Sequence, residues 1–331
     1  MRSRTQFLSS MRRMVDRMLV KTFRWATVLM TAIVAAGVTS APAKPLVDAP
    51  NCALFPPNNH WNRRIDHLPR HPRSRQIVAS VGRQQTLHPD FGSGTWNGGP
   101  IGIPYTTVAG DQALVPVSFH YDDESDPGPY PIPPDVPIEG GPDADGDRHV
   151  IVVDRDECAL HELFDARPGD GGARWTAGSG ARWDLSSNAL RPKGWTSADA
   201  AGLPILPGLA RYDEVASGEI DHALRFTVSR TRRHFVYPAR HFASSATARR
   251  LPSMGMRFRL KKGFDVSRFP QQARVVLRAL KRYGMIVADN GSDWFISGAP
   301  HDEWDNDQLR ALKSVKGKHF VVVDTSRLAR P

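Results

Sequence analysis

Cysteine is scarce in this chain: only Cys52 and Cys158 occur among 331 residues. A disulfide-rich scaffold and a four-cysteine zinc site are therefore excluded. In an oxidising compartment an even pair predicts one disulfide, which would tie the start of the mature chain to its middle. Closing a loop of that length would stabilise the fold by about 4–5 kcal/mol in the chain-entropy model. Two unpaired, buried thiols are the alternative.

Long apolar runs are also lacking. The run Trp25–Val38 has 14 residues, fewer than the roughly 20 that span a bilayer as a helix. It follows seven Lys or Arg residues and precedes the small residues of Ala41–Ala43, which is the pattern of a signal peptide. We therefore predict that residues 1–43 are a signal peptide and that the mature chain is exported, to the periplasm or the extracellular space, without a stable membrane span. A retained anchor is the alternative.

Most of the excess positive charge of the chain lies in residues 1–43, the predicted signal peptide. The whole chain carries a formal net charge of +10, and residues 1–43 hold seven Lys or Arg and one Asp, which leaves +4 for the rest. We therefore expect no nucleic-acid partner. The sequence also lacks a GxSxG elbow, a P-loop and a GxGxxG after a strand, so acyl-enzyme, nucleotide and dinucleotide chemistry have no motif here. No cofactor is firmly implied, apart from a calcium ion considered below.

Five segments predict β-strands, because they are short, bounded by Gly, Pro or Asp, and rich in β-branched and aromatic residues. The third and fourth of them predict a hairpin with a tight polar turn. Strands at this spacing without helices between them favour a mainly β fold with an antiparallel sandwich or jelly-roll-like core. The segments are Ile101–Val108, Leu114–Tyr121, His149–Asp154, Ala159–Phe164 and Ala181–Leu185.

The C-terminal part, residues 254–331, differs in kind and predicts an α+β unit packed on the β core. A helix is expected between Pro270 and Gly284, where apolar residues recur at helical spacing. Nothing resembling a flexible linker precedes this part. Residues 44–331 are therefore expected to form a single domain, with the β core in 44–253.

A hairpin, a short helix and a last strand are predicted beyond that helix. The strings GMIVAD and DWFISG flank Asn290-Gly291, a favoured pair for a two-residue turn, and predict a hairpin. A short helix over residues 305–314 should lead to a last strand over residues 319–324.

A long polar loop, Tyr121–Asp147, interrupts the predicted strands. Such a loop inside a compact domain is more often functional than idle. Asp143, Asp145 and Asp147 alternate in a turn bounded by Pro and Gly, a pattern that suits oxygen-ligated Ca²⁺. Arg148 stands where a calcium-binding loop needs Gly, so a solvated acidic turn is the alternative.

The stretch from residue 199 to residue 241 holds the densest collection of chemically useful side chains. A loop punctuated by Gly and Pro precedes one predicted strand with two such residues, and a second predicted strand ends in two more. We expect these side chains to line a cleft. The candidate site residues are Asp199, His222, Arg225, Arg240 and His241.

His222 has two interpretations. Alternation along a strand would place it with Leu224, Phe226 and Val228, on the apolar face. It is then either a buried histidine satisfied by a backbone carbonyl, or a histidine in a dry pocket whose pKa is tuned for proton transfer.

Carboxylates supply the other machinery, because glycoside hydrolysis normally uses two of them about 5–10 Å apart. Arginine in the same cleft would suit an acidic sugar, and with His and Tyr it would instead allow elimination beside a uronate. We therefore predict an exported protein that acts on glycans or another cell-envelope polymer. A carbohydrate- or wall-binding module and a structural envelope protein are the alternatives. The carboxylate candidates are Asp122, Asp123, Glu124, Asp126, Asp199, Asp213 and Glu219.

Three long strings resemble a family of secreted bacterial proteins of uncharacterised function. They are LPILPGLARYDEVASGEIDHALRF, YPARHF and ALKRYGMIVADNGSDWFISG, and the resemblance extends from CALFPP to the last predicted strand. It implies an exported single-domain protein and carries over no activity.

Overall fold

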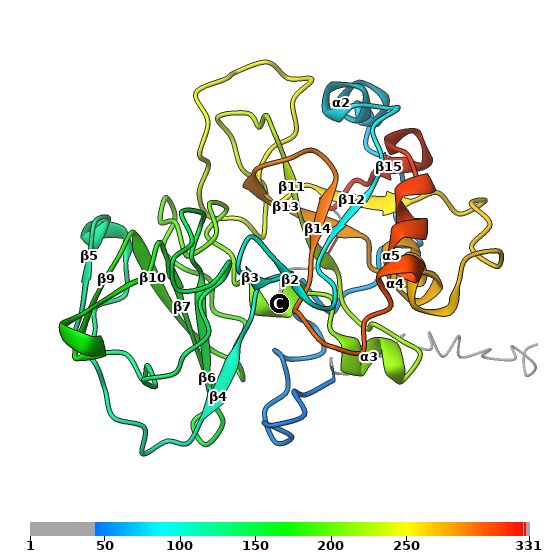
Figure 1. Ribbon diagram of the computed structural model, residues 1–331. Helices are drawn as coiled ribbons and strands as arrows, with labels where there is room; N and C mark the ends of the chain where they lie inside the picture. The colour runs from blue at the N-terminus through cyan, green and yellow to red at the C-terminus, as the bar shows by residue number, and fades with distance from the viewer. Residues whose placement is uncertain (1–43, 327, 329–331) are drawn as a thin grey trace, which may run out of the picture. The chain divides into compact units, whose positions relative to one another are not determined.

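The computed structural model describes residues 44–326 and 328 (Figure 1), all of which belong to one compact unit. The signal peptide predicted for residues 1–43 lies outside the described residues. The largest sheet has the strand order β1-β14-β11-β13-β12-β15. Its strands are β1 (His88–Asp90), β11 (Leu224–Val228), β12 (Arg257–Leu260), β13 (Met285–Asn290), β14 (Phe295–Ser297) and β15 (Phe320–Val322).

Strand β11 lies inside this sheet and corrects one prediction. It pairs in parallel with β13 and antiparallel with β14, so the predicted hairpin around Asn290-Gly291 is wrong. Leu224, Phe226 and Val228 of β11 are 0 % exposed. Because water cannot reach the backbone of such a buried strand, its polar groups need partners on both edges. Strands β13 and β14 supply one edge each.

A second sheet has the order β10-β7-β6-β4. The predicted hairpin is confirmed here, because β6 and β7 pair antiparallel. Alternate residues of β6 enter different cores: Ile151 and Val153 join the main core, whereas Val150 and Val152 join a smaller one. Apolar layers on both faces explain why β6 is a continuous apolar run. The strands are β4 (Thr106–Val108), β6 (Val150–Asp154), β7 (Ala159–Phe164) and β10 (Ser179–Asp184).

Two small sheets complete the β structure. One joins β5 (Val117–Phe119), β9 (Arg174–Ala177) and β8 (Arg167–Gly169), and the other joins β2 (Thr95–Trp96) to β3 (Gly99–Pro100). The mainly β character is thus confirmed. The strands are not uniformly antiparallel, however, because β1–β14, β11–β13, β4–β6 and β5–β9 pair in parallel. No sheet in the described part of the chain closes on itself, and a sandwich or jelly-roll arrangement stays a prediction.

The second predicted strand of the candidate site, which was to end in Arg240 and His241, does not form. The segment makes only an isolated bridge between Phe235 and Met254, and residues 236–245 contain no strand. A cis peptide precedes Pro238, and proline has no N–H to donate to a sheet. The segment is a loop instead.

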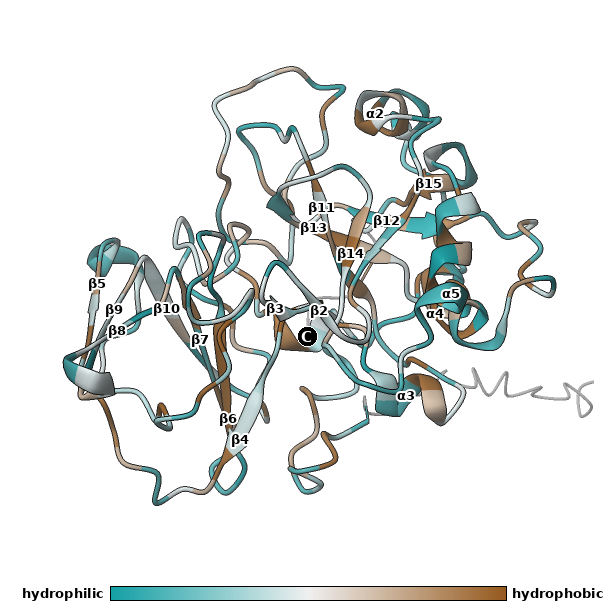
Figure 2. Cartoon of the chain, in the orientation of Figure 1, coloured by the Kyte–Doolittle hydropathy of each residue, from teal (hydrophilic) through white to brown (hydrophobic). Residues whose placement is uncertain are grey.

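Helices cover parts of the six-stranded sheet. The predicted C-terminal helix is confirmed as α4 (Gln271–Arg282), which buries Ala273, Val276, Leu277 and Leu280. Figure 2 shows strand β6 in the strongly hydrophobic colour. No described helix is long and apolar enough to cross a membrane. The other helices are α2 (Ser74–Val81), α3 (Tyr212–Ala216) and α5 (Asn306–Arg310), with 3-10 turns at Asp122–Glu124, Asp170–Gly172, Leu206–Gly208, Ala311–Ser314 and Gly317–His319.

The N-terminal segment is fixed to the core at several points. Trp61 and Ile65 are 0 % exposed, and the predicted disulfide between Cys52 and Cys158 is confirmed, with 5.3 Å between the Cα atoms. Cys158 lies in the turn of the β6–β7 hairpin. The bridge therefore holds a segment with little regular structure against the four-stranded sheet.

Replacing both cysteines with alanine should lower the free energy of unfolding by about 2–5 kcal/mol, because the unfolded chain regains the freedom of a loop of 106 residues. Urea denaturation followed by tryptophan fluorescence measures this loss. Wild-type protein with a reductant that opens the bridge is the matched control and should lose a similar amount. Equal stability of the variant and the oxidised wild type would contradict the assigned role.

Candidate functional site

A buried ion pair joins two of the predicted site residues. Arg225 of β11 donates from Nε to Asp199 Oδ2 at 2.7 Å and from Nη2 to Asp199 Oδ1 at 2.8 Å. The third nitrogen, Nη1, donates to Ser297 Oγ at 2.7 Å. Asp199 is 0 % exposed and Arg225 4 %. A two-point contact between a guanidinium and a carboxylate satisfies both ions, which is the condition for burying them.

Local hydrogen bonds place Asp199 at this position. Ser197 Oγ accepts from the Asp199 N–H at 3.0 Å and donates to Leu203 O at 2.6 Å, so the backbone turns sharply around the aspartate. The Gly202 N–H closes the turn on Asp199 O at 3.0 Å. Residue 199 therefore presents its carboxylate to the β11 strand rather than to a helix end.

A second aspartate, Asp289, lies beside this pair at the end of β13. Its Oδ2 is 3.4 Å from Arg225 Nη2. Burial and, after it, the charge of Asp199 raise the pKa of the Asp289 carboxyl to about 8, against the opposing effect of Arg225. Asp289 therefore keeps its proton at neutral pH beside an ionised carboxylate, the behaviour of two acids that share one site.

The Asp289 carboxyl faces a cavity of about 350 Å³. Three further ionisable side chains line this cavity: Glu124, Asp147 and His241. Tyr121, which is 48 % exposed, adds an aromatic ring. We call this space the Asp289 cavity. Its remaining lining residues are Phe164, Ser179, Thr196, Ser197, Ala198, Ala200, Ala243 and Asn290.

Glu124 and His241 are oriented by backbone groups. Glu124 Oε2 accepts from the Thr196 N–H at 2.9 Å and lies 3.9 Å from His241 Nε2. His241 Nδ1 is 2.8 Å from Ala200 O. Because a carbonyl can only accept, Nδ1 carries a proton and Nε2 is the nitrogen directed toward Glu124.

A buried histidine supplies a second positive charge close to this region. His149 Nδ1 is 2.6 Å from Glu139 Oε2, and Nε2 is 3.1 Å from Ala198 O. Burial lowers the pKa of His149, but the Glu139 carboxylate raises it more strongly, to about 9. Both ring nitrogens face acceptors, so the geometry fits an imidazolium.

A third buried acid links the two sheets. Glu162 of β7 accepts from the N–H groups of Ile205 and Leu206, each at 2.9 Å to Oε1. Burial raises the pKa of Glu162 to about 7, against these backbone donors. The carboxyl is fully engaged in holding the chain after Asp199, so it serves structure rather than ligand contact.

The other predicted site residues fall in different places. Arg240 donates from Nε to Arg191 O at 2.8 Å and does not line the Asp289 cavity. His222 lies elsewhere, with Nε2 3.1 Å from Glu214 Oε1 and Nδ1 2.9 Å from Ala223 O. It precedes β11 and is 1 % exposed. His222 therefore fits the first of its two interpretations, a histidine satisfied inside the core.

The calcium prediction finds no geometric support. In residues 44–326 and 328, no three His, Cys, Asp or Glu side chains form a group that could hold a metal ion. Asp143, Asp145 and Asp147 are exposed. The Arg148 guanidinium occupies the inside of their turn, where Nη1 donates to Pro142 O at 2.8 Å and to Ala144 O at 2.9 Å. Arg148 therefore already binds the carbonyl oxygens that a calcium ion in this turn would need as ligands.

Sequence reasoning missed Asp289, Glu139 and His149. One signal was available for Asp289: it ends the apolar run of β13, where a carboxyl is drawn into a buried sheet. The neighbouring Asn290-Gly291 pair suggested a turn instead. No local sequence pattern identifies Glu139 and His149 as a pair, because they lie 10 residues apart in the chain.

Comparison of the chain with protein-family models, with curated proteins and with solved structures finds no match in any of the three. The family resemblance stated from the sequence therefore stays a prediction.

Replacing Arg225 with methionine should cost about 3–5 kcal/mol of folding stability, because the buried Asp199 carboxylate loses its partner. Arg278→Met, an exposed arginine of α4, is the matched control and should stay within about 0.5 kcal/mol of wild type. Chemical denaturation at neutral pH measures both. A small loss in Arg225→Met would mean that Asp199 takes up a proton at little cost, against the ion pair described above.

The His149–Glu139 pair should make stability depend on pH. A histidine with a folded pKa of about 9 stabilises the fold fully below its unfolded pKa of about 6.5, and that stabilisation is lost as the pH rises toward 9. Glu139→Gln should therefore lose more stability at pH 6 than above pH 9, relative to wild type. Histidine NMR in wild type should find both ring nitrogens protonated at pH 7.5. A neutral ring at that pH would contradict the assignment.

Proposed function

We propose that this protein is an exported hydrolase of glycosidic bonds and that Asp289 is its proton donor. The observation that supports this most is the Asp289 carboxyl at the Asp289 cavity, with a pKa raised to about 8 by burial and by Asp199. A general acid must hold a proton at working pH and stand where a substrate can reach it. Asp289 meets both conditions.

Hydrolysis also needs an ionised carboxylate. Glu124 fits this role, because it lines the same cavity and accepts from the Thr196 N–H at 2.9 Å. In the proposed reaction Asp289 gives its proton to the glycosidic oxygen as the bond from that oxygen to the sugar carbon breaks. Glu124 takes a proton from the attacking water, whose oxygen forms the new bond to carbon. Asp289 then regains a proton from solvent and Glu124 releases one to solvent, so the net change is the addition of one water.

Arg225 and Asp199 would act through Asp289 rather than on the sugar. Both are nearly fully buried, and the guanidinium is occupied by Asp199 and Ser297. Arg225 holds the Asp199 carboxylate in place by two hydrogen bonds, and the charge of Asp199 favours the protonated form of Asp289. We therefore treat the pair as positioning residues.

Elimination beside a uronate is less well supported. That reaction would need an arginine free to grip the sugar carboxylate and a tyrosine acid in the same cleft. Arg225 is engaged, and Tyr212 stacks on His301 with 4.6 Å between ring centroids. Tyr121 does line the Asp289 cavity, but none of the described arginines lines it to bind the sugar carboxylate.

A non-catalytic carbohydrate- or wall-binding role is the second candidate, and one observation favours it. Trp96 is 73 % exposed, and Tyr121 at the cavity is 48 % exposed. Exposed aromatic faces stack on the apolar faces of sugar rings. Binding by these residues would need no proton transfer, so the two functions separate in an experiment.

Asp289→Asn should abolish product release from the polysaccharide that wild type cleaves, and it should not lower stability at pH 6. Asparagine copies the size and neutrality of the protonated acid, so packing is kept while the proton is lost. The assay follows new reducing ends from a panel of neutral and acidic polysaccharides. Wild-type activity should fall as the pH rises through about 8, because Asp289 loses its proton there.

Asp143→Asn, an exposed aspartate of the polar loop, is the matched control and should retain full activity. If Asp289→Asn cleaves as fast as wild type, Asp289 is not the proton donor. Retention of the protein on an insoluble polysaccharide without any product would favour the binding role instead.

A further inference from the structure

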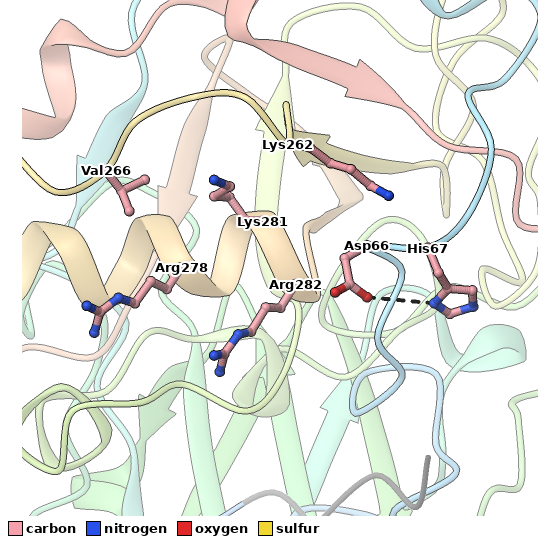
Figure 3. A pocket seen from close by; sticks show the side chains of 7 residues that line it. All are labelled: Asp66, His67, Lys262, Val266, Arg278, Lys281 and Arg282. Atoms are coloured by element: carbon pink, nitrogen blue, oxygen red, sulfur yellow. Dashed lines mark ion pairs between the residues drawn. The ribbon is translucent and has the colours of Figure 1, made fainter. Parts of the chain in front are cut away.

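A second hollow lies beside helix α4 and shares no lining residue with the Asp289 cavity. It has a volume of about 470 Å³. Figure 3 shows Arg278 and Arg282 projecting from one side of α4, with Lys281 on the other side and Lys262 on the adjoining loop. We call it the α4 groove. Its lining residues are Asp66, His67, Lys262, Val266, Arg278, Lys281 and Arg282.

Most of the positive charge in the α4 groove is uncompensated. Arg278 and Lys262 make no ion pair within the described part of the chain. Lys281 Nζ donates to the neutral Phe264 carbonyl at 3.0 Å. Only Arg282 pairs with a carboxylate, that of Glu219.

The carboxylate in the groove does not neutralise these cations. Asp66 is bound by Arg64, which lies outside the lining, at 2.5 Å, and it lies 3.7 Å from His67 Nδ1. Lys262, Arg278 and Lys281 therefore line the groove without an ion pair in the described part of the chain. Asp265 lies close enough to Lys281 for the lysine to lower its pKa, but no carboxylate of the described residues binds any of the three cations directly.

Cations crowd the neighbouring surface as well. Burial lowers the pKa of Lys261, and Arg70, Arg83 and Lys318 lower it further. A ligand that brings negative charge reduces the repulsion between such cations, and this favours its binding. The positive field thus extends past the groove, along the chain that follows β12.

The groove also continues past α4. Arg278 and Arg282 line a smaller hollow of about 130 Å³ on their other side, together with Gly218 and Glu219. Arg278 and Arg282 are four residues apart, so they lie on one side of the helix, about 6 Å apart along its axis, and Lys281 projects from the other side. Two arginines that line both hollows, with Lys281 and Lys262 around the larger one, suit a chain with repeated negative charges better than a single small anion.

We propose that the α4 groove binds a linear polyanionic glycan, a sugar polymer with carboxylate, sulfate or phosphate groups. The Arg278 guanidinium is free to form a two-point contact with such a group. Single-stranded nucleic acid is a poorer fit, because no Phe, Tyr or Trp lines the groove for bases to stack on. This binding does not depend on the proposed hydrolysis.

The test measures the affinity of the full mature chain for fluorescent oligogalacturonate and dextran sulfate by anisotropy. Asp289→Asn is the background, so that cleavage cannot remove the ligand. Binding should weaken strongly between about 50 mM and about 500 mM salt, because screening shortens the reach of the cations. Neutral dextran of the same length should not bind.

Arg278→Gln combined with Lys281→Gln should reduce the affinity at least about tenfold, or about 1.4 kcal/mol. Lys193→Gln combined with Lys313→Gln removes the same charge from exposed positions outside the groove and should leave the affinity within about twofold. An equal loss of affinity in the two double variants would mean that only the net charge of the protein matters, and it would contradict the proposed site. Tighter binding of a single-stranded oligonucleotide, or no binding of either acidic glycan, would overturn the ligand class.

Cleavage assays keep this result separate from the proposed function. Failure of polyanion binding leaves the role of Asp289 as it was. Loss of activity in Asp289→Asn likewise says nothing about the affinity of the groove.

Discussion

The interior of this protein depends on one charged contact, the pair between Arg225 and Asp199. Neither ion has access to solvent, and an isolated charge at that depth would cost several kcal/mol. Two hydrogen bonds to Asp199 and one to Ser297 satisfy the guanidinium. Because Ser297 ends β14 and Asp199 belongs to a loop, the arginine of β11 fixes both against the six-stranded sheet.

That loop in turn fastens the four-stranded sheet. Glu162 of β7 accepts from the N–H groups of Ile205 and Leu206, and Ser179 of β10 donates to Ser197 O at 2.7 Å. Residues 197–206 thus carry the polar contacts that join the two sheets, while apolar residues of both sheets share the main core. The Asp289 cavity lies against this joint, since Ser197 and Ala198 line it. The polar contacts that hold the fold therefore also set the charges of the candidate site.

Local patterns in the sequence were enough for elements whose partners lie nearby in the chain. Helix α4 and the β6–β7 hairpin follow from residue spacing alone, and the Cys52–Cys158 bridge follows from cysteine number. The hairpin predicted around Asn290-Gly291 failed, because turn chemistry says nothing of a third strand, β11, that enters between the other two from a distant part of the chain.

The candidate site was predicted in part, for a related reason. Asp199, Arg225 and His241 were chosen for their chemistry and do lie at or beneath the Asp289 cavity. Asp289 was missed, because its pKa depends on burial and on Asp199, 90 positions away. His222 was also chosen for its chemistry, but it lies in the core, where Glu214, eight residues before it, is its partner. The fold decides which charged groups lie close together, and the spacing of residues along the sequence does not predict it.

A proton held by Asp289 weakens the fold at neutral pH. An aspartate with a folded pKa of about 8 keeps its proton where the unfolded chain has released it, so between about pH 4 and 8 stability falls by up to about 1.4 kcal/mol per pH unit. An asparagine or serine would remove that loss and still fit beside Asp199. A buried acid kept at such a cost, at the wall of a cavity, is more typical of a functional group than of a packing residue. The same reasoning sets Asp289 apart from Glu162, whose carboxyl is fully buried and fully used by backbone N–H groups.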